Sequence, residues 1–146
     1  MSILVDANVL LRRTQPDHEH HVPAVESVAQ LLTAGEPVCF APQNIAEFWN
    51  VATRPVANNG IGLVPAAVFT EIKKIERFLS VLAESPLAYE EWKRLILKYQ
   101  ITGVRTHDAR LVAVMNVHRV RRILTFNEGD FADFDIEVIN PKALVG

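Results

Sequence analysis

Residues 2–13 read SILVDANVLLRR, a short apolar run that ends at Asp6 and leads into a second apolar run. Residues 2–5 favour a strand buried on both faces, because such strands are continuously apolar and do not alternate with polar residues. Residues 7–13 favour a helix that ends in two arginines, where positive charge suits the negative end of the helix dipole. Asp6 therefore stands at the carboxyl end of a predicted buried strand.

The same order of apolar strand and amphipathic helix repeats along the chain. Three further strands are predicted at residues 38–41, 122–126 and 136–139. Helices are predicted at residues 22–34, 42–54, 65–83, 87–99 and 109–118. This alternation predicts an α/β fold with a mainly parallel sheet. In such sheets ligands bind beyond the carboxyl ends of the strands, so functional side chains are expected at that edge.

The bulk composition limits the class of protein. A length of 146 residues, with 49% hydrophobic and 22% charged residues, predicts one globular domain over residues 1–146. The single cysteine, Cys39, lies in an apolar run and is expected to be a buried thiol in a reducing compartment. The sequence shows no signal peptide and no apolar run of bilayer length, so we expect a cytoplasmic protein without a membrane partner. The net charge of −2 excludes a polybasic nucleic-acid binder, but it leaves local attraction of phosphate open.

Acidic and amide side chains follow the predicted strands. Asp6 follows the first strand, Glu47 lies early in the helix after the second, and Asn127 and Asp130 follow the third. Asp108 opens another predicted helix. Because parallel strands share one carboxyl edge, these groups are expected to converge, and their mutual repulsion then requires a proton or a cation. Carboxylate oxygens suit Mg²⁺ or Mn²⁺, which can activate water and stabilise charge on a phosphate.

Each acidic residue also has a purely structural interpretation. Asp6 and Asp108 can act as helix N-caps, which is a common use of aspartate at that position. Glu47 can be a first-turn acid favoured by the helix dipole. Asp130 and Asp133 can be ordinary turn residues. These interpretations are compatible with a functional site, and they leave the two uses of each residue open.

Four segments of the chain resemble the PIN-domain family, and within it the VapC-type toxins of bacterial toxin–antitoxin pairs. They are LVDANVLL at residues 4–11, PQNIAEFW at 42–49, THDARLVA at 106–113 and LTFNEGDF at 124–131. Each segment alone is a weak signal, whereas the four in this order cover nearly the whole chain and are fairly specific.

The resemblance implies an α/β/α sandwich and an endoribonuclease that uses Mg²⁺ or Mn²⁺ to cleave single-stranded RNA. Asp6, Glu47 and Asp108 match the first three acidic positions of the family and would hold the metal. The family often has aspartate where this chain has Asn127, so either Asn127 or Asp130 would complete the catalytic set, and the number of metal ions stays open. The resemblance also implies a small antitoxin partner and a homodimer.

Three other groups of residues have both a structural and a functional interpretation. His18, His20 and His21 flank Glu19, but a zinc site would need a further converging ligand, so a solvated loop is favoured. Phe48, Trp49 and Trp92 can stack on bases, although core packing is the commoner use of aromatic residues. Seven arginines are candidates for contact with RNA phosphates, against the commoner use of arginine as a solvated surface charge: Arg12, Arg13, Arg105, Arg110, Arg119, Arg121 and Arg122.

Other enzyme classes fit the first strand less well. A haloacid-dehalogenase-like phosphatase needs a second aspartate two residues after Asp6, where this chain has Asn8. A receiver domain needs an acidic pair and a downstream lysine, and neither is evident. A Rossmann domain needs a glycine-rich first turn, which residues 6–8 lack. A non-catalytic PIN-like module that binds RNA or protein remains the alternative, and the retained acids argue against it.

Overall fold

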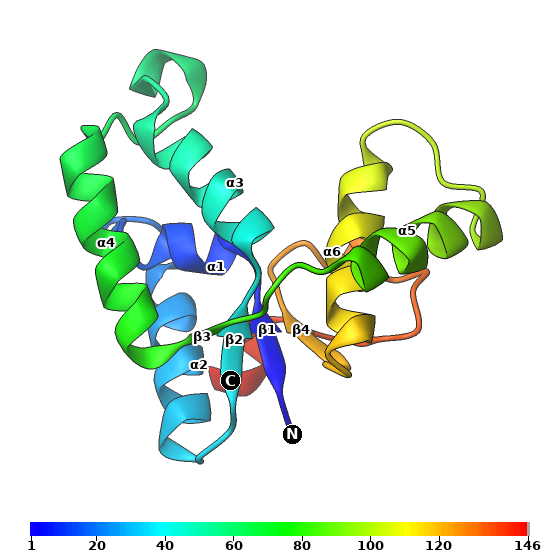
Figure 1. The fold of residues 1–146 in the computed structure, drawn as a ribbon. Helices are drawn as coiled ribbons and strands as arrows, with labels where there is room; N and C mark the ends of the chain where they lie inside the picture. Colours follow the sequence, from blue (N-terminus) through cyan, green and yellow to red (C-terminus); the bar gives the residue numbers. More distant parts are fainter. Residues whose placement is uncertain (146) are drawn as a thin grey trace.

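The computed structural model describes residues 1–145, and Gly146, the last residue of the predicted domain, lies outside the described residues. Its centre is a five-stranded sheet in the order β3-β2-β1-β4-β5, with every pair of neighbouring strands parallel (Figure 1). The strands are β1 (Ile3–Val5), β2 (Val38–Phe40), β3 (Ser80–Val81), β4 (Arg122–Leu124) and β5 (Glu137–Ile139). The predicted α/β fold with a parallel sheet is therefore confirmed.

The helices cover both faces of the sheet, which explains why the central strands are continuously apolar. They are α1 (Ala7–Arg12), α2 (His21–Thr33), α3 (Pro42–Thr53), α4 (Pro65–Phe78), α5 (Pro86–Lys98), α6 (Arg105–Val117) and α7 (Pro141–Val145). Two short 3₁₀ turns, η1 (Val56–Asn58) and η2 (Glu128–Asp130), lie in the connections. Among residues 1–145, no helix combines the length and the apolar character that crossing a membrane requires.

Alternate residues of β1 pack in two separate hydrophobic cores, because successive side chains of a strand point to opposite faces. Ile3 and Val5 belong to a core shared with α1, α2, α3 and α4, whereas Leu4 belongs to a core shared with α5 and α6. Figure 1 shows α1 to α4 on one side of the sheet and α5 and α6 on the other. The α/β/α sandwich follows from this division.

The segment after α4 departs from the sequence prediction. The helix expected over residues 65–83 ends at Phe78, and Ser80–Val81 forms the edge strand β3. Leu79 takes an extended conformation (φ −113°, ψ 143°), and the N–H of Leu82 donates to the carbonyl of Phe40 over 2.8 Å. Pairing with β2 thus decides the structure of two exposed residues, whose local sequence carries no strand pattern.

Candidate active site

Asp6 combines a structural and a potential chemical role. Its side chain caps α1, since Oδ1 accepts a hydrogen bond of 2.8 Å from the backbone N–H of Ala7. The cap interpretation of Asp6 is therefore confirmed. Its other oxygen, Oδ2, accepts a hydrogen bond of 2.9 Å from the hydroxyl of Thr125. Asp6 is only 7% exposed, so its carboxylate is fixed in direction at the carboxyl end of the central strand.

A polar network joins the ends of β1 and β4 behind Asp6. The hydroxyl of Thr125, which is fully buried, accepts hydrogen bonds from the Asn8 side-chain amide and from the N–H of Asn127, both 3.0 Å long. The Oδ1 of Asn8 in turn accepts from the N–H of Phe126 over 3.2 Å. Sequence reasoning missed Asn8 and Thr125 as site residues. Both are polar residues near the ends of apolar strands, but the hydrogen bond between them joins positions 117 apart, which no local pattern indicates.

Glu47 points from the second turn of α3, which begins at Pro42, and is exposed. The alternative interpretation of Glu47 as a first-turn acid is wrong, because the first turn of α3 holds no acidic residue. Its Oε1 accepts a hydrogen bond of 3.1 Å from Nε2 of Gln43, one helical turn earlier. The same Nε2 donates to the carbonyl of His107 over 2.8 Å, so Gln43 ties Glu47 to the start of α6. Gln43 was also missed, because its contact with α6 depends on the tertiary structure.

Asp108 lies inside the first turn of α6 rather than at its cap. The helix begins at Arg105 with Val104 as the capping residue, so the N-cap interpretation and the predicted helix start near Asp108 are both wrong. The backbone N–H groups of Thr106 and His107 form turn bonds with the carbonyls of Gly103 and Val104, which extends the helix backwards. Asp108 still lies near the positive end of the helix dipole, which favours a carboxylate there.

All five predicted site residues line one cavity of about 370 Å³: Asp6, Glu47, Asp108, Asn127 and Asp130. The cavity opens at the carboxyl edge of the sheet, where the parallel strands were expected to place it. Asn127 and Asp130 flank and form η2, and both are exposed. Sequence spacing therefore predicted which side chains share a cavity, although it could not give their orientation.

Burial, together with neighbouring negative charge, raises the pKa of two of these carboxyl groups. The pKa of Asp6 is raised to about 6, chiefly by burial and to a smaller extent by the charges of Glu47 and Asp108, while the hydrogen bonds from Thr125 and Ala7 oppose the shift. Burial also raises the pKa of Asp108 to about 6, followed by the negative charges of Asp130 and Glu47. The cavity thus holds carboxylates that gain from a proton or a cation.

The donor atoms of the cavity fit a hard divalent cation in their chemistry, because carboxylate and amide oxygens are the ligands that Mg²⁺ and Mn²⁺ prefer. Across residues 1–145, however, no three Asp, Glu, His or Cys side chains are already placed to hold a metal ion. Repulsion between like charges keeps carboxylates apart without a cation, so metal binding requires these side chains to move inward.

One cation lies among these acids. Arg54, the residue that ends α3, lines the same cavity, and its buried Nε has no hydrogen-bond partner among residues 1–145. A guanidinium that lacks an internal partner can accept a phosphate as its ligand, since its fork of N–H donors matches phosphate oxygens. Arg54 therefore supplies positive charge to a cavity that is otherwise acidic.

The remaining predicted groups have mainly structural positions. The Nδ1 of His18 accepts from the N–H of His20, and the His20 ring stacks on Phe126 at a centroid distance of 4.4 Å. Phe48 is fully buried, so the core interpretation is confirmed for it. The indole N–H of Trp92 donates to the carbonyl of Thr106 over 2.9 Å.

Comparison with known proteins agrees with this geometry. A family model described as the PIN domain matches residues 3–137. The chain belongs to the PIN-domain family. Among curated proteins, this PIN domain is similar to Ribonuclease VapC37 of Mycobacterium tuberculosis, with 29% identity over 97% of this chain and 99% of the relative.

Solved PIN-domain structures share the fold at low sequence identity. VapBC2 from Rickettsia felis, solved with a promoter DNA fragment, has a TM-score of 0.69 and 12% identity, over 96% of this chain and 98% of that one. VapC20 of Mycobacterium tuberculosis, a toxin that cleaves the sarcin–ricin loop, has a TM-score of 0.62 and 18% identity, over 93% and 98% of the two chains. The PIN-like architecture predicted from the sequence is confirmed.

Proposed function

We propose that this PIN domain is a metal-dependent endoribonuclease that hydrolyses phosphodiester bonds of RNA, and that it is the cytoplasmic toxin of a toxin–antitoxin pair. The observation that carries the proposal is the cavity shared by Asp6, Glu47 and Asp108 at the carboxyl edge of the sheet. Similarity to Ribonuclease VapC37 over nearly the full length of both chains supports the choice of RNA as substrate.

Asp6 and Asp108 would bind a Mg²⁺ or Mn²⁺ ion directly, and Glu47 would bind the ion or one of its waters. Asn127 and Asp130 would complete or orient the ligand set. When bound in such a site, the ion supplies Lewis acidity, which makes a water nucleophilic and offsets charge that develops on the scissile phosphate. The raised pKa values of Asp6 and Asp108 support this assignment, because a cation relieves the same repulsion as a proton does.

The residues around the acids have supporting roles. Thr125 and the N–H of Ala7 fix the two oxygens of Asp6, which leaves the carboxylate one orientation. Gln43 holds Glu47 against α6. Arg54 would contact the phosphate that enters the cavity, and would orient it without contributing a ligand to the ion. Each of these groups positions a reactant, which is how residues around a metal site lower a barrier.

An antitoxin partner and a homodimer are part of the proposal. A structure with a similar fold, described as a toxin–antitoxin complex from Klebsiella pneumoniae, supports the antitoxin partner, with a TM-score of 0.64 and 19% identity over 95% of this chain and 97% of that one. On this chain, α2 and α4 expose large apolar side chains that a partner would cover, namely Val22, Val25, Phe69 and Phe78.

Cleavage of RNA with and without chelator tests the activity. The wild type is expected to cut single-stranded RNA in Mg²⁺ or Mn²⁺ and to stop in EDTA, whereas Asp6→Asn should be inactive in both. Asp17→Asn removes an exposed aspartate outside the cavity and serves as the matched control. Cleavage that persists in EDTA and in Asp6→Asn would exclude the metal mechanism. A folded protein that binds RNA and never cuts it would favour the non-catalytic module.

Growth measurements test the biological role. Expression of the wild type without a partner should slow growth, and Asp108→Ala at the same protein level should not. Equal, undiminished growth of both strains would contradict a toxin and leave a housekeeping nuclease or an inactive PIN domain.

A further inference from the structure

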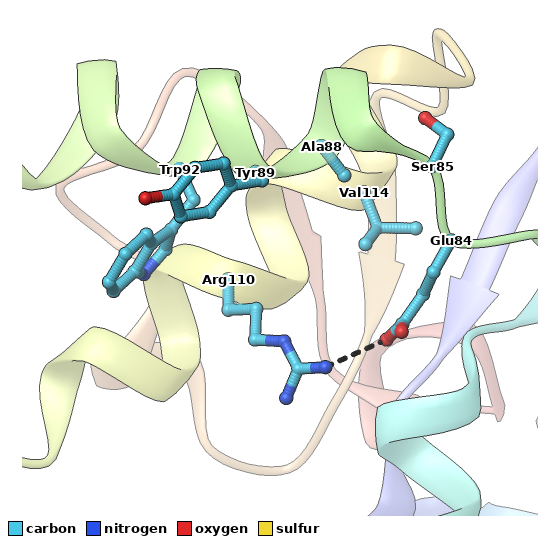
Figure 2. Close-up of a pocket in the computed structure, with 7 residues that line it drawn as sticks. All are labelled: Glu84, Ser85, Ala88, Tyr89, Trp92, Arg110 and Val114. Atoms are coloured by element: carbon cyan, nitrogen blue, oxygen red, sulfur yellow. Dashed lines mark hydrogen bonds and ion pairs between the residues drawn. The ribbon is translucent and has the colours of Figure 1, made fainter.

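A second cavity, of about 330 Å³, lies between α5 and α6. It is lined by Glu84, Ser85, Ala88, Tyr89, Trp92, Arg110 and Val114. Figure 2 shows two aromatic rings on one side of the cavity, with Arg110 and Glu84 joined across its mouth. We call it the aromatic cavity. None of these residues belongs to the acidic set described above.

One ring of the aromatic cavity is held in place by a hydrogen bond, and the other is accessible to solvent. The rings of Tyr89 and Trp92 lie 6.2 Å apart at an interplanar angle of 26°, and the hydrogen bond to Thr106 fixes the indole. Tyr89 is 58% exposed, which leaves its ring accessible from solvent. A flat apolar surface with one anchored ring suits a planar ligand, because stacking then costs little conformational entropy.

Charged groups border the aromatic wall. The Arg110 guanidinium forms an ion pair with Glu84 at 3.1 Å, and both groups are partly exposed. The Lys93 ammonium lies 4.6 Å from the centroid of the Tyr89 ring. Lys93 also pairs with Glu90 at 3.1 Å, so both cations at the rim have a carboxylate partner. The rim therefore offers N–H donors and a carboxylate acceptor, which complement the polar edge of a nucleobase.

A third cavity, of about 470 Å³, connects the aromatic cavity with the acidic one. It shares Glu84 and Arg110 with the aromatic cavity, and Gln43, Glu47 and Asn50 with the acidic cavity. The path from the acids to the two rings is therefore continuous along the surface. Arg110 follows Asp108 by two residues in α6, so one helix contributes to both ends of this path.

We infer that the aromatic cavity binds a base of single-stranded RNA next to the scissile phosphate, stacked on Tyr89 and Trp92, with Arg110 and Glu84 contacting its edge. This inference rests on the proposed function, because it takes the acidic cavity as the cleavage site. Continuity with that cavity, and an exposed aromatic ring beside polar donor and acceptor groups, favour RNA over a segment of a partner protein. Double-stranded RNA does not fit, since its bases are stacked on one another and not free to enter.

The test uses short single-stranded oligoribonucleotides of random sequence, titrated into full-length Asp108→Asn so that the RNA stays intact. The readout is the NMR signal of each indole N–H. The Trp92 signal should shift, and that of Trp49, which packs in the other core, should not. An abasic ribose-phosphate chain of the same length should leave Trp92 unchanged, because it has no base to stack.

Matched variants measure the contribution of the exposed ring. Tyr89→Ala should raise the dissociation constant roughly tenfold, within the range of about 5- to 150-fold for loss of one stacked base. Tyr89→Phe should retain affinity. Leu97→Ala is the control, since Leu97 is a similarly exposed apolar side chain on the same helix, α5, and does not line the cavity.

Several outcomes would overturn the inference: a Trp92 signal that is insensitive to RNA, an equal shift with the abasic chain, or unchanged affinity in Tyr89→Ala. Loss of dimer mass or of binding to a partner protein in Tyr89→Ala, with RNA affinity intact, would assign the cavity to a protein contact instead. Cleavage assays distinguish failure of the base-binding inference from failure of the proposed nuclease function. If Tyr89→Ala cuts RNA with the wild-type KM while Asp108→Asn is inactive, the proposed nuclease function is supported and only the base-binding site is rejected.

Discussion

The hydroxyl of Thr125 donates a hydrogen bond of 2.9 Å to Oδ2 of Asp6, although the two residues are 119 positions apart in the chain. The same oxygen of Thr125 accepts from the Asn8 amide and the Asn127 N–H. One buried hydroxyl thus connects an acidic residue of the cavity with the loop that carries Asn127.

Replacing Thr125 with valine tests that connection, because the two side chains have nearly the same shape. Thr125→Val should reduce metal affinity or activity by roughly 10- to 100-fold, as loss of a group that orients a ligand does. It should also destabilise the protein by about 1–3 kcal/mol, since buried N–H donors lose their acceptor. Thr125→Ser should restore most of both. Activity at the wild-type level in a folded Thr125→Val would show that the hydroxyl does not position Asp6.

Metal-linked stability tests the acidic cavity without knowledge of the substrate. At free Mn²⁺ a hundredfold above the dissociation constant, the wild type should gain about 2.7 kcal/mol in thermal melts. Asp108→Asn should lose most of this gain, yet without metal it should be as stable as the wild type or more so, because one repelling charge is gone. Asp17→Asn is the control. A wild-type melting temperature that stays flat across the titration would remove the basis for a metal site.

The pH dependence of stability follows from the raised pKa of Asp6. Folding moves this pKa from 3.8 to about 6, so the native state favours the protonated form and the contribution of Asp6 to stability is lost as pH rises through that interval. For Asp6 alone, the difference between the two limits is roughly 3 kcal/mol. The metal-free wild type should therefore become more stable relative to Asp6→Asn as pH falls from 7 toward 4. Chemical denaturation at several pH values measures this, and parallel curves would contradict it.

Gln43 gives a prediction about the position of Glu47. Gln43→Met keeps the length of the side chain and removes the hydrogen bonds to Glu47 and to the carbonyl of His107. We expect kcat to fall severalfold with KM nearly unchanged, because Glu47 is released and the path for RNA stays open. The cost in stability should be about 1 kcal/mol, which is typical of a lost hydrogen bond. A change in KM alone would instead place Gln43 in RNA binding.

Much of the site was predictable because it depends on short buried strands. The apolar run before Asp6 indicates a strand with no exposed face, and parallel strands align their carboxyl edges, so the shared cavity of Asp6, Glu47 and Asp108 follows from the order of elements. Gln43 and Thr125 were not predictable in the same way. Their contacts join residues 64 and 119 positions apart, and no local pattern encodes such pairs.

The helix predicted over residues 65–83 was wrong at its end for a related reason, since β3 was not foreseen there. Residues 65–83 continue an apolar stripe of helical spacing, whereas the structure ends α4 at Phe78 because the following residues pair with β2. Backbone hydrogen bonds to a neighbouring strand replace those of the helix without any change in side-chain pattern. The start of α6, three residues before Asp108, was missed for the same reason. Backbone turn bonds extend the helix there, and no capping side chain marks its start.

The position of β1 between β2 and β4 has a consequence for synthesis of the protein. Ribosomes release the chain from its N-terminus, so Asp6 emerges long before Thr125, Asn127 and Asp130. A nascent chain that ends before β4 lacks one neighbour of its central strand and one wall of its acidic cavity. The order of strands in the sheet therefore delays assembly of the cavity until the segment that carries β4 and η2 has been made.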